Sequence, residues 1–159
     1  MNPELSQKFG NRIRVRVCGL LFDDERLLLV RHSGIGQENI LWIPPGGGVD
    51  FGERLEDALI REFEEETGMR ISVDRLLTMH EYIEPPLHAI EFFFLVTANP
   101  HQIPAKGTDP ELKEKQIIQE VKYVTFKELA VMPGRFKHQI LRKIDSAGAL
   151  LNLERHFKF

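Results

Sequence analysis

The sequence predicts an α/β fold for a single domain over residues 1–159. Residues 12–17 show the period-two alternation of a strand, residues 53–67 show the 3.6-residue periodicity of an amphipathic helix, and residues 89–98 are almost continuously apolar. With 159 residues, 42% of them hydrophobic and 28% charged, the chain can form one hydrophobic core. Its sequence contains no internal repeat or low-complexity segment that would indicate a second domain.

A β-hairpin is expected near the N-terminus, after a loose lead-in over residues 1–11. Isoleucine and valine alternate with arginine at 12–17, which is typical of a strand, and the apolar run continues to Phe22. The acidic residues 23–25 are expected to turn the chain, so that residues 26–31 form the second strand of the hairpin.

A short strand and a glycine-rich loop precede the central helix. Residues 33–39 are expected to form a loop and residues 41–43 a strand. Residues 44–52 should form another loop because two prolines precede three glycines there. The helix is expected to begin at Glu53 and to end before Gly68, which suits a left-handed C-terminal cap.

The second half of the chain is expected to hold further strands and two short helices. The apolar run at 89–98 is typical of a strand that is covered on both faces. Strands are expected at 71–84 (with a break near Asp74), 89–98 and 121–125, a turn at Pro85-Pro86, a long loop at 99–110, and helices at 126–130 and 136–147.

The central helix carries carboxylates on the side that also carries leucines. At about 100° per residue, Glu62 and Glu66 fall near the azimuth of Leu55 and Leu59, and Glu65 lies beside them. Like charges at i, i+4 repel by roughly 0.2–0.5 kcal/mol even in water, and partial burial adds to this cost. A solvated acidic face is the common explanation for a glutamate-rich helix, but such a face would lie opposite the leucines. We therefore expect a divalent cation at these carboxylates.

These glycines and carboxylates follow the spacing of a known signature. In these residues and their spacing the chain resembles the Nudix hydrolase family, although Phe63 stands at a position that is usually aliphatic. The resemblance implies an α/β/α sandwich with a mixed, partly antiparallel sheet, hydrolysis of a nucleoside diphosphate linked to another moiety, and Mg²⁺ or Mn²⁺ as the cofactor. The matching residues are Gly47, Glu53, Arg61, Glu62, Phe63, Glu65, Glu66, Gly68 and Met69.

The resemblance also implies roles for individual residues. Glu65 and Glu66 would bind the metal ion directly, and Glu62 would bind it or position the attacking water. A main-chain carbonyl of Gly46 or Gly47 would complete the metal shell. The other residues of the motif would hold the glycine loop and the helix together, and these are Gly47, Glu53, Arg61 and Gly68.

Magnesium chemistry suits such a set of residues. Mg²⁺ prefers octahedral oxygen coordination and usually shares it among carboxylates, waters and substrate phosphates. The ion would neutralise phosphate charge and lower the pKa of a bound water, and a carboxylate would then accept the proton as general base.

Members of the family often use another carboxylate from outside the helix. Glu120 is the first candidate because it lies between the long loop and the strand that follows it. Rivals in the loop are Glu111 and Glu114, and further alternatives are Glu81, Glu84 and Glu91.

The substrate class is less well determined than the reaction. Pro85 stands sixteen residues after Met69, a distance that resembles the branch of the family that cleaves ADP-ribose, although a turn between two strands also explains a proline there. We expect ADP-ribose or a nucleotide sugar as substrate. The alternatives are a nucleoside triphosphate pyrophosphohydrolase and a nucleotide-sensing Nudix module without catalysis.

Other features narrow the partners and the compartment. A net charge of −3 gives no electrostatic case for binding a nucleic-acid polymer, so we expect a small nucleotide. The chain shows no secretory signal and no apolar window of membrane-spanning length, so a cytoplasmic location away from membranes is expected. A homodimer is plausible from family habit. Arg31 and His32 are interpreted as a solvated strand end, and Cys18 as a buried structural thiol.

Overall fold

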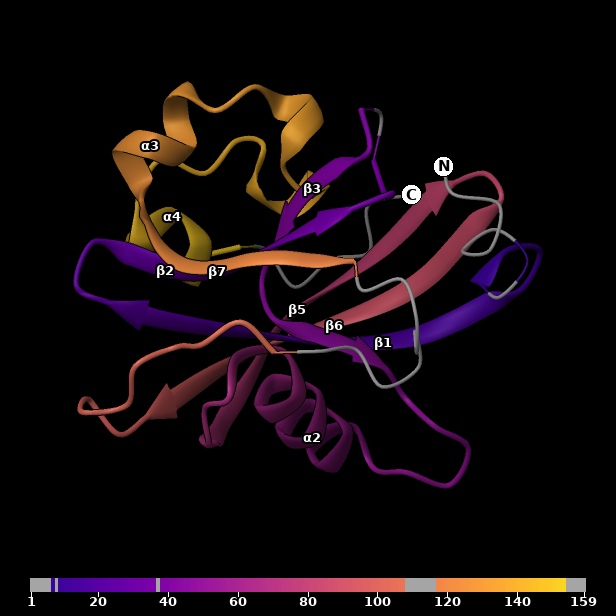
Figure 1. The fold of residues 1–159 in the computed structure, drawn as a ribbon, viewed down its shortest axis with the longest axis horizontal. Helices are drawn as coiled ribbons and strands as arrows, with labels where there is room; N and C mark the ends of the chain where they lie inside the picture. The colour runs from indigo at the N-terminus through magenta and orange to yellow at the C-terminus, as the bar shows by residue number, and fades with distance from the viewer. Residues whose placement is uncertain (1–6, 8, 37, 108–116, 154–159) are drawn as a thin grey trace.

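The computed structural model describes residues 7, 9–36, 38–107 and 117–153, and Figure 1 shows their arrangement. The strands of these described residues form a seven-stranded sheet. They are β1 (Ile13–Asp23), β2 (Arg26–Ser33), β3 (Ile40–Ile43), β4 (Gly46–Gly48), β5 (Ile71–Glu84), β6 (Leu87–Ala98) and β7 (Ile118–Thr125).

The sheet is mixed, as expected. Strand β1 runs parallel to β6 and forms an antiparallel hairpin with β2, while β5 pairs antiparallel with β6. The strand order is β3-β2-β1-β6-β5, with β4 also paired to β1 and β7 to β2. Register shifts interrupt β5 between Val73 and Arg75 and again between Leu76 and Thr78, close to the break expected at Asp74.

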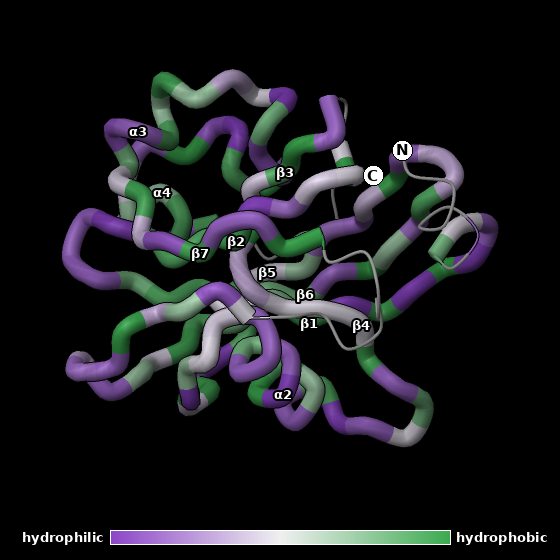
Figure 2. Tube along the Cα trace, in the orientation of Figure 1, coloured by the Kyte–Doolittle hydropathy of each residue, from purple (hydrophilic) through white to green (hydrophobic). Residues whose placement is uncertain are grey.

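Helices lie on both sides of the strands. Helix α2 (Leu55–Thr67) covers one side, and α3 (Phe126–Val131) and α4 (Ala147–Leu151) lie on the other side in Figure 1. Helix α2 begins after Arg54 and ends at Gly68, whose φ of 67° gives the expected left-handed cap. Figure 2 shows hydrophilic and hydrophobic residues together on α2, in agreement with an amphipathic helix. No helix of the described residues is long and apolar enough to cross a membrane.

Two buried clusters hold these layers together. On the α2 side, Phe63 packs with strand residues such as Val17 and Phe94. On the other side, buried strand residues pack with the C-terminal segments, and Cys18 and Leu141 belong to this cluster. Burial raises the pKa of the Cys18 thiol, in agreement with a structural role.

The glycine run forms a short strand rather than the expected loop. Gly46–Gly48 pairs antiparallel with Arg16–Cys18. Gly46 has a φ of 149°, and a Cβ there would lie 2.0 Å from the Val17 carbonyl oxygen. Only glycine permits this approach of two backbones, and the extended segment places its peptide groups against α2.

The helix expected over residues 136–147 is also corrected. The segment contains two 3₁₀ turns, η1 (Gly134–Phe136) and η2 (Gln139–Leu141), with extended backbone at Lys137 between them. The His138 amide donates to the Trp42 carbonyl at 2.9 Å, and Lys137 Nζ donates to the Leu129 carbonyl at 2.5 Å. These tertiary hydrogen bonds outweigh the helical periodicity, although Leu141 still reaches the core.

Strand β1 reverses the usual orientation of polar and apolar residues at its N-terminal end. Arg14 and Arg16 point to the same side of the sheet as their neighbours on β6, Ala89 and Glu91, which are both buried. The apolar residues Ile13 and Val15 face the other side and are 66% and 42% exposed. A strand with inward arginines and outward aliphatic residues gains nothing in stability from that pattern, so the arginines require another explanation.

Candidate functional site

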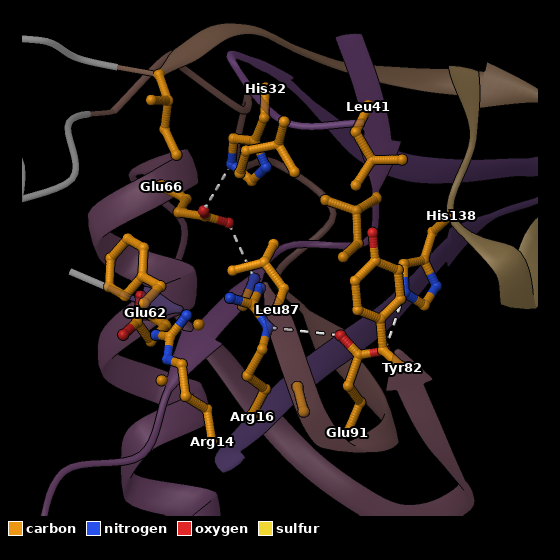
Figure 3. A pocket seen from close by; sticks show the side chains of 18 of the residues that line it. Arg14, Arg16, His32, Leu41, Glu62, Glu66, Tyr82, Leu87, Glu91 and His138 are labelled. Carbon is orange, nitrogen blue, oxygen red and sulfur yellow. Dashed lines mark hydrogen bonds and ion pairs between the residues drawn. The ribbon is translucent and has the colours of Figure 1, made fainter. Parts of the chain in front are cut away.

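A pocket opens between the glycine strand β4, helix α2 and the inner face of the sheet (Figure 3). Its polar residues come from elements that are far apart in the sequence, while leucines, isoleucines and Phe9 form apolar walls. The polar and glycine residues that line it are Arg14, Arg16, His32, Gly46, Gly47, Gly48, Glu62, Glu66, Tyr82, His88, Glu91 and His138.

Glu66 is the most firmly oriented carboxylate at this pocket. Its side chain is buried, and its two oxygens have different partners. The Gly46 amide donates to Oε2 at 2.9 Å, and His32 Nε2 lies 3.1 Å from Oε1. His32 is therefore a buried residue of the site, and its interpretation as part of a solvated strand end was wrong.

Glu62 lies one helical turn earlier and faces Gly47. A Cβ on Gly47 would lie 2.2 Å from the Glu62 carboxylate carbon, so the motif needs glycine for this approach. Burial raises the pKa of Glu62 to about 7, although the Arg61 guanidinium, 2.9 Å away, opposes the shift. A carboxylate with a pKa near neutrality is suited to proton transfer.

Arg61 connects the glycine strand to the helix. Its guanidinium donates to both oxygens of Glu53, at 2.9 and 2.8 Å, and to the Gly48 carbonyl at 3.2 Å. It also reaches Glu62 and, at 3.4 Å, Glu65. These hydrogen bonds connect the Gly48 carbonyl to Glu53 and to α2. The structural role of Arg61 and Glu53 in the motif stays a prediction.

Glu65 is the most exposed of the three carboxylates, and its Oε2 shares Arg61 Nη1 with Glu62 Oε1, at 3.4 and 2.9 Å. It does not line the pocket but borders a separate hollow with Asp57, Ile60, Arg61 and Glu64. Its side chain is 27% exposed, against 13% for Glu62 and 7% for Glu66. Glu62 and Glu66 thus line the pocket, and Glu65 lies at its edge beside Arg61.

Glu120, the carboxylate expected from outside the helix, is engaged elsewhere. It lies on β7 opposite Arg31 and pairs with it at 3.5 Å and with Lys122 at 3.1 Å. It does not line the pocket. The rival candidates Glu111 and Glu114 lie outside the described residues.

The donors at the mouth of the pocket fit a hard divalent cation. Glu62 and Glu66 offer carboxylate oxygens beside a strand of three glycines, which carries no side chain of its own between them. Oxygen donors of this kind suit Mg²⁺ or Mn²⁺. The assignment of Glu62, Glu65, Glu66 and the Gly46 carbonyl as ligands stays a prediction.

Glu91 and His138, which line the deep end of the pocket, form a second polar cluster with His80. His138 Nε2 and His80 Nδ1 lie 2.9 and 3.3 Å from Glu91 Oε2, and Arg16 Nε lies 3.5 Å from Oε1. Burial alone would raise the pKa of Glu91, but His138, His80 and Arg16 outweigh it and hold that pKa well below its usual range.

This cluster resembles a metal site in its spacing, because its three possible ligand atoms lie within 4.8 Å of one another. It is the one such group found among the described residues. However, His138 Nδ1 accepts a hydrogen bond from the Ile140 amide. The ring proton of neutral His138 therefore lies on Nε2, the atom that a metal would need, and Arg16 adds a positive charge beside Glu91. We interpret the cluster as an ion-pair network that fixes Glu91 and Arg16.

The matching family was identified by sequence comparison. The NUDIX domain family matches residues 12–144, which is most of the chain. The chain belongs to the Nudix family. Among solved structures, the MutT NUDIX hydrolase from Burkholderia pseudomallei superposes with a TM-score of 0.61 at 26% identity, covering 80% of this chain and 92% of that one. The α/β/α Nudix fold expected from the sequence is thereby confirmed.

Curated Nudix relatives differ in the substrates that they are named for. The chain is 35% identical over 111 residues to the m7GpppN-mRNA hydrolase NUDT17 of Danio rerio, covering 60% of this chain and 37% of the relative. It is 32% identical over 84 residues to the ADP-ribose pyrophosphatase of Methanocaldococcus jannaschii, covering 52% and 49%. The aligned part of the chain thus spans less than half the length of either relative.

Sequence reasoning found the Nudix motif but missed most of the pocket beyond it. Arg14, Arg16 and His138 were not singled out, and Glu91 was only one of several alternatives. A signal for the arginines exists, because two of them stand at i and i+2 on the predicted first strand and must share a face. Nothing in the local sequence shows that this face points inward.

Proposed function

We propose that this Nudix chain is a Mg²⁺-dependent hydrolase that cleaves the pyrophosphate linkage of a nucleoside diphosphate derivative. One observation carries the proposal: Glu62 and Glu66 from α2 line the same pocket as Arg14 and Arg16 from β1. Carboxylates that can hold a metal ion and guanidinium groups that can pair with phosphate are the two kinds of group that a pyrophosphate needs.

The glutamates of the motif have different roles in this proposal. Glu66, held by Gly46 and His32, and Glu65 would hold the ion, which when bound neutralises phosphate charge and lowers the pKa of a bound water. Glu62, which lines the pocket one helical turn before Glu66, would accept the proton of the attacking water. The water oxygen forms a bond to phosphorus, and the bond from that phosphorus to the bridging oxygen breaks.

Within this reaction class we place ADP-ribose or a nucleotide sugar first. Pro85 lies in the turn between β5 and β6, and the residues on either side of that turn, Tyr82 and Leu87, line the pocket. A leaving group bound beyond the pyrophosphate would therefore meet this turn. The relatives include an ADP-ribose pyrophosphatase and also an m7GpppN-mRNA hydrolase, so both substrate classes have to be tested.

The test is a substrate panel with matched variants. ADP-ribose, nucleotide sugars, capped dinucleotides and nucleoside triphosphates are incubated with Mg²⁺, and released phosphate and nucleotides are measured. Glu66→Gln should reduce turnover at least about a hundredfold, because it removes a metal-binding charge. Glu64→Gln is the control, since Glu64 lies on the same helix and, within the described residues, its carboxylate pairs with exposed Arg70.

Two results would contradict the proposal. Undiminished turnover in Glu66→Gln would remove the metal role of that carboxylate. Binding of a nucleotide without cleavage of any substrate in the panel would favour the sensing module instead.

A further inference from the structure

The geometry points to Arg14 and Arg16 as the residues that bind the phosphate lying farther from the carboxylates of α2. This inference rests on the proposed function, because it assigns the second half of the same pyrophosphate. The starting observation is the reversed orientation of β1, in which both arginines face the pocket while Ile13 and Val15 face outward.

Both arginines lie against the glycine strand that carries the motif. Arg16 pairs with Gly48 across the β1–β4 ladder. A Cβ built on Gly48 would lie 2.8 Å from an Arg14 Nη2, so glycine leaves room for that guanidinium. Arg14 also packs over the Phe9 ring at 4.0 Å, which fixes its position. The two cations thus border the same three glycines that Glu62 and Glu66 border from the helix side.

Arg16 is oriented from behind by the network at the deep end of the pocket. Its Nε lies 3.5 Å from Glu91 Oε1, and the other oxygen of Glu91 faces His80 and His138. Figure 3 shows Arg16 between Glu66 on one side and Glu91 on the other. Glu91 therefore acts as a positioning residue that holds the guanidinium of Arg16 toward the pocket.

The charge distribution explains why two arginines are needed here. A metal ion held by the carboxylates of α2 would neutralise only part of the negative charge of a pyrophosphate. The farther phosphate would be repelled unless fixed cations faced it. Guanidinium groups bind phosphate oxygens through two parallel N–H bonds, and they keep their charge at any physiological pH.

Binding of inorganic pyrophosphate without metal tests this assignment directly. Calorimetric titration is carried out in EDTA on the unmodified protein and on Arg14→Gln, Arg16→Gln and Arg16→Lys. Each glutamine variant should weaken pyrophosphate binding at least about tenfold, and Arg16→Lys should recover part of the loss because it keeps the charge. Arg75→Gln is the control, since Arg75 is exposed on β5 and pairs with Asp74.

The outcomes separate this inference from the proposed function. Glu66→Gln should lose hydrolysis and yet bind pyrophosphate without metal at least as well as the unmodified protein. The assignment is overturned if both glutamine variants bind like the unmodified protein, if Arg16→Lys is no better than Arg16→Gln, or if the unmodified protein shows no saturable binding below about 10 mM. Unchanged thermal melting of the variants shows that any loss is not a loss of folding.

Discussion

His32 Nε2 lies 3.1 Å from Glu66 Oε1, and both side chains are buried. The contact joins the end of β2 to the last turn of α2, two segments that are 34 positions apart. The Gly46 amide donates to the other oxygen, Oε2, so the two contacts together fix the orientation of the Glu66 carboxylate. Groups that hold a metal ligand from behind are often needed for affinity almost as much as the ligand itself.

Replacing His32 should therefore weaken metal binding rather than reduce the stability of the fold. His32→Ala is expected to raise the Mg²⁺ concentration for half-maximal activity by about tenfold, and His32→Gln, which can still donate, should recover most of the loss. Direct Mn²⁺ binding, followed by electron paramagnetic resonance, should show the same order. His101→Ala in the exposed loop after β6 is the control. Equal Mn²⁺ affinity in His32→Ala and the unmodified protein would refute the role.

Arg61→Lys should cost both stability and activity, although it conserves the charge. A lysine cannot donate to Glu53 through two parallel bonds and reach Gly48 and Glu62 at the same time. Arg61 is 32% exposed, so solvent screening limits the loss to about 1 kcal/mol. Chemical denaturation measures the loss of stability, and kcat should fall because Glu62 loses a fixed neighbour. A variant with unchanged kcat would show that Arg61 does not organise the site.

Glu62 should make the metal-free protein less stable as the pH rises. Its pKa is about 7 in the folded protein and 4.5 in a fully solvated chain, so the folded state binds more protons between these values. Stability therefore falls as the pH rises from about 4.5 to about 7 and changes no further above that, by an amount on the order of 3 kcal/mol at most.

Glu62→Gln should remove this dependence. In EDTA it is expected to melt at a higher temperature than the unmodified protein at pH 8, and the difference should vanish near pH 4.5. Glu64→Gln, with an exposed carboxylate on the same helix, should show no such gain. A Glu62→Gln variant that is less stable at pH 8 would contradict the assignment of a raised pKa.

The segment after β6 is docked onto the end of α2 through main-chain contacts. The Ala105 and Gly107 amides donate to the Thr67 and Glu66 carbonyls at 2.9 Å each. A Cβ on Gly107 would lie 1.8 Å from the Glu65 carbonyl oxygen, so Gly107→Ala should displace the segment and destabilise the protein by about 2 kcal/mol.

Gly148→Ala provides a matched control for this substitution. Gly148 lies within α4, and a Cβ there would meet nothing within 4 Å. Alanine should stabilise that helix by about 0.5–1 kcal/mol. Thermal melts of the two variants should therefore move in opposite directions. An unchanged melting temperature in Gly107→Ala would show that the segment does not pack closely against the helix.

The sequence was sufficient where local chemistry determines the structure. The hairpin, α2 and the cap at Gly68 follow from alternation, helical periodicity and the freedom of glycine at positive φ. The motif spacing located Glu62 and Glu66, because positions four apart on a helix must share a face.

Tertiary contacts decided the features that the sequence did not predict. The 3₁₀ turns around Lys137 depend on hydrogen bonds to Trp42 and Leu129, which no local pattern reveals. In the same way, Arg16 meets Glu91 through the pairing of β1 with β6, which joins residues 75 positions apart. The pocket beyond the motif is assembled by such contacts.

The parallel pairing of β1 with β6 also bears on how the protein folds. Parallel strands need a long connection between them, and here that connection contains β2, β3, β4, α2 and β5. The β1–β6 pair must close this large loop, so it should form late and slowly. Arg16 and Glu91 meet only when it closes, and refolding molecules should therefore acquire pyrophosphate binding in their last kinetic phase, after helix α2 has formed.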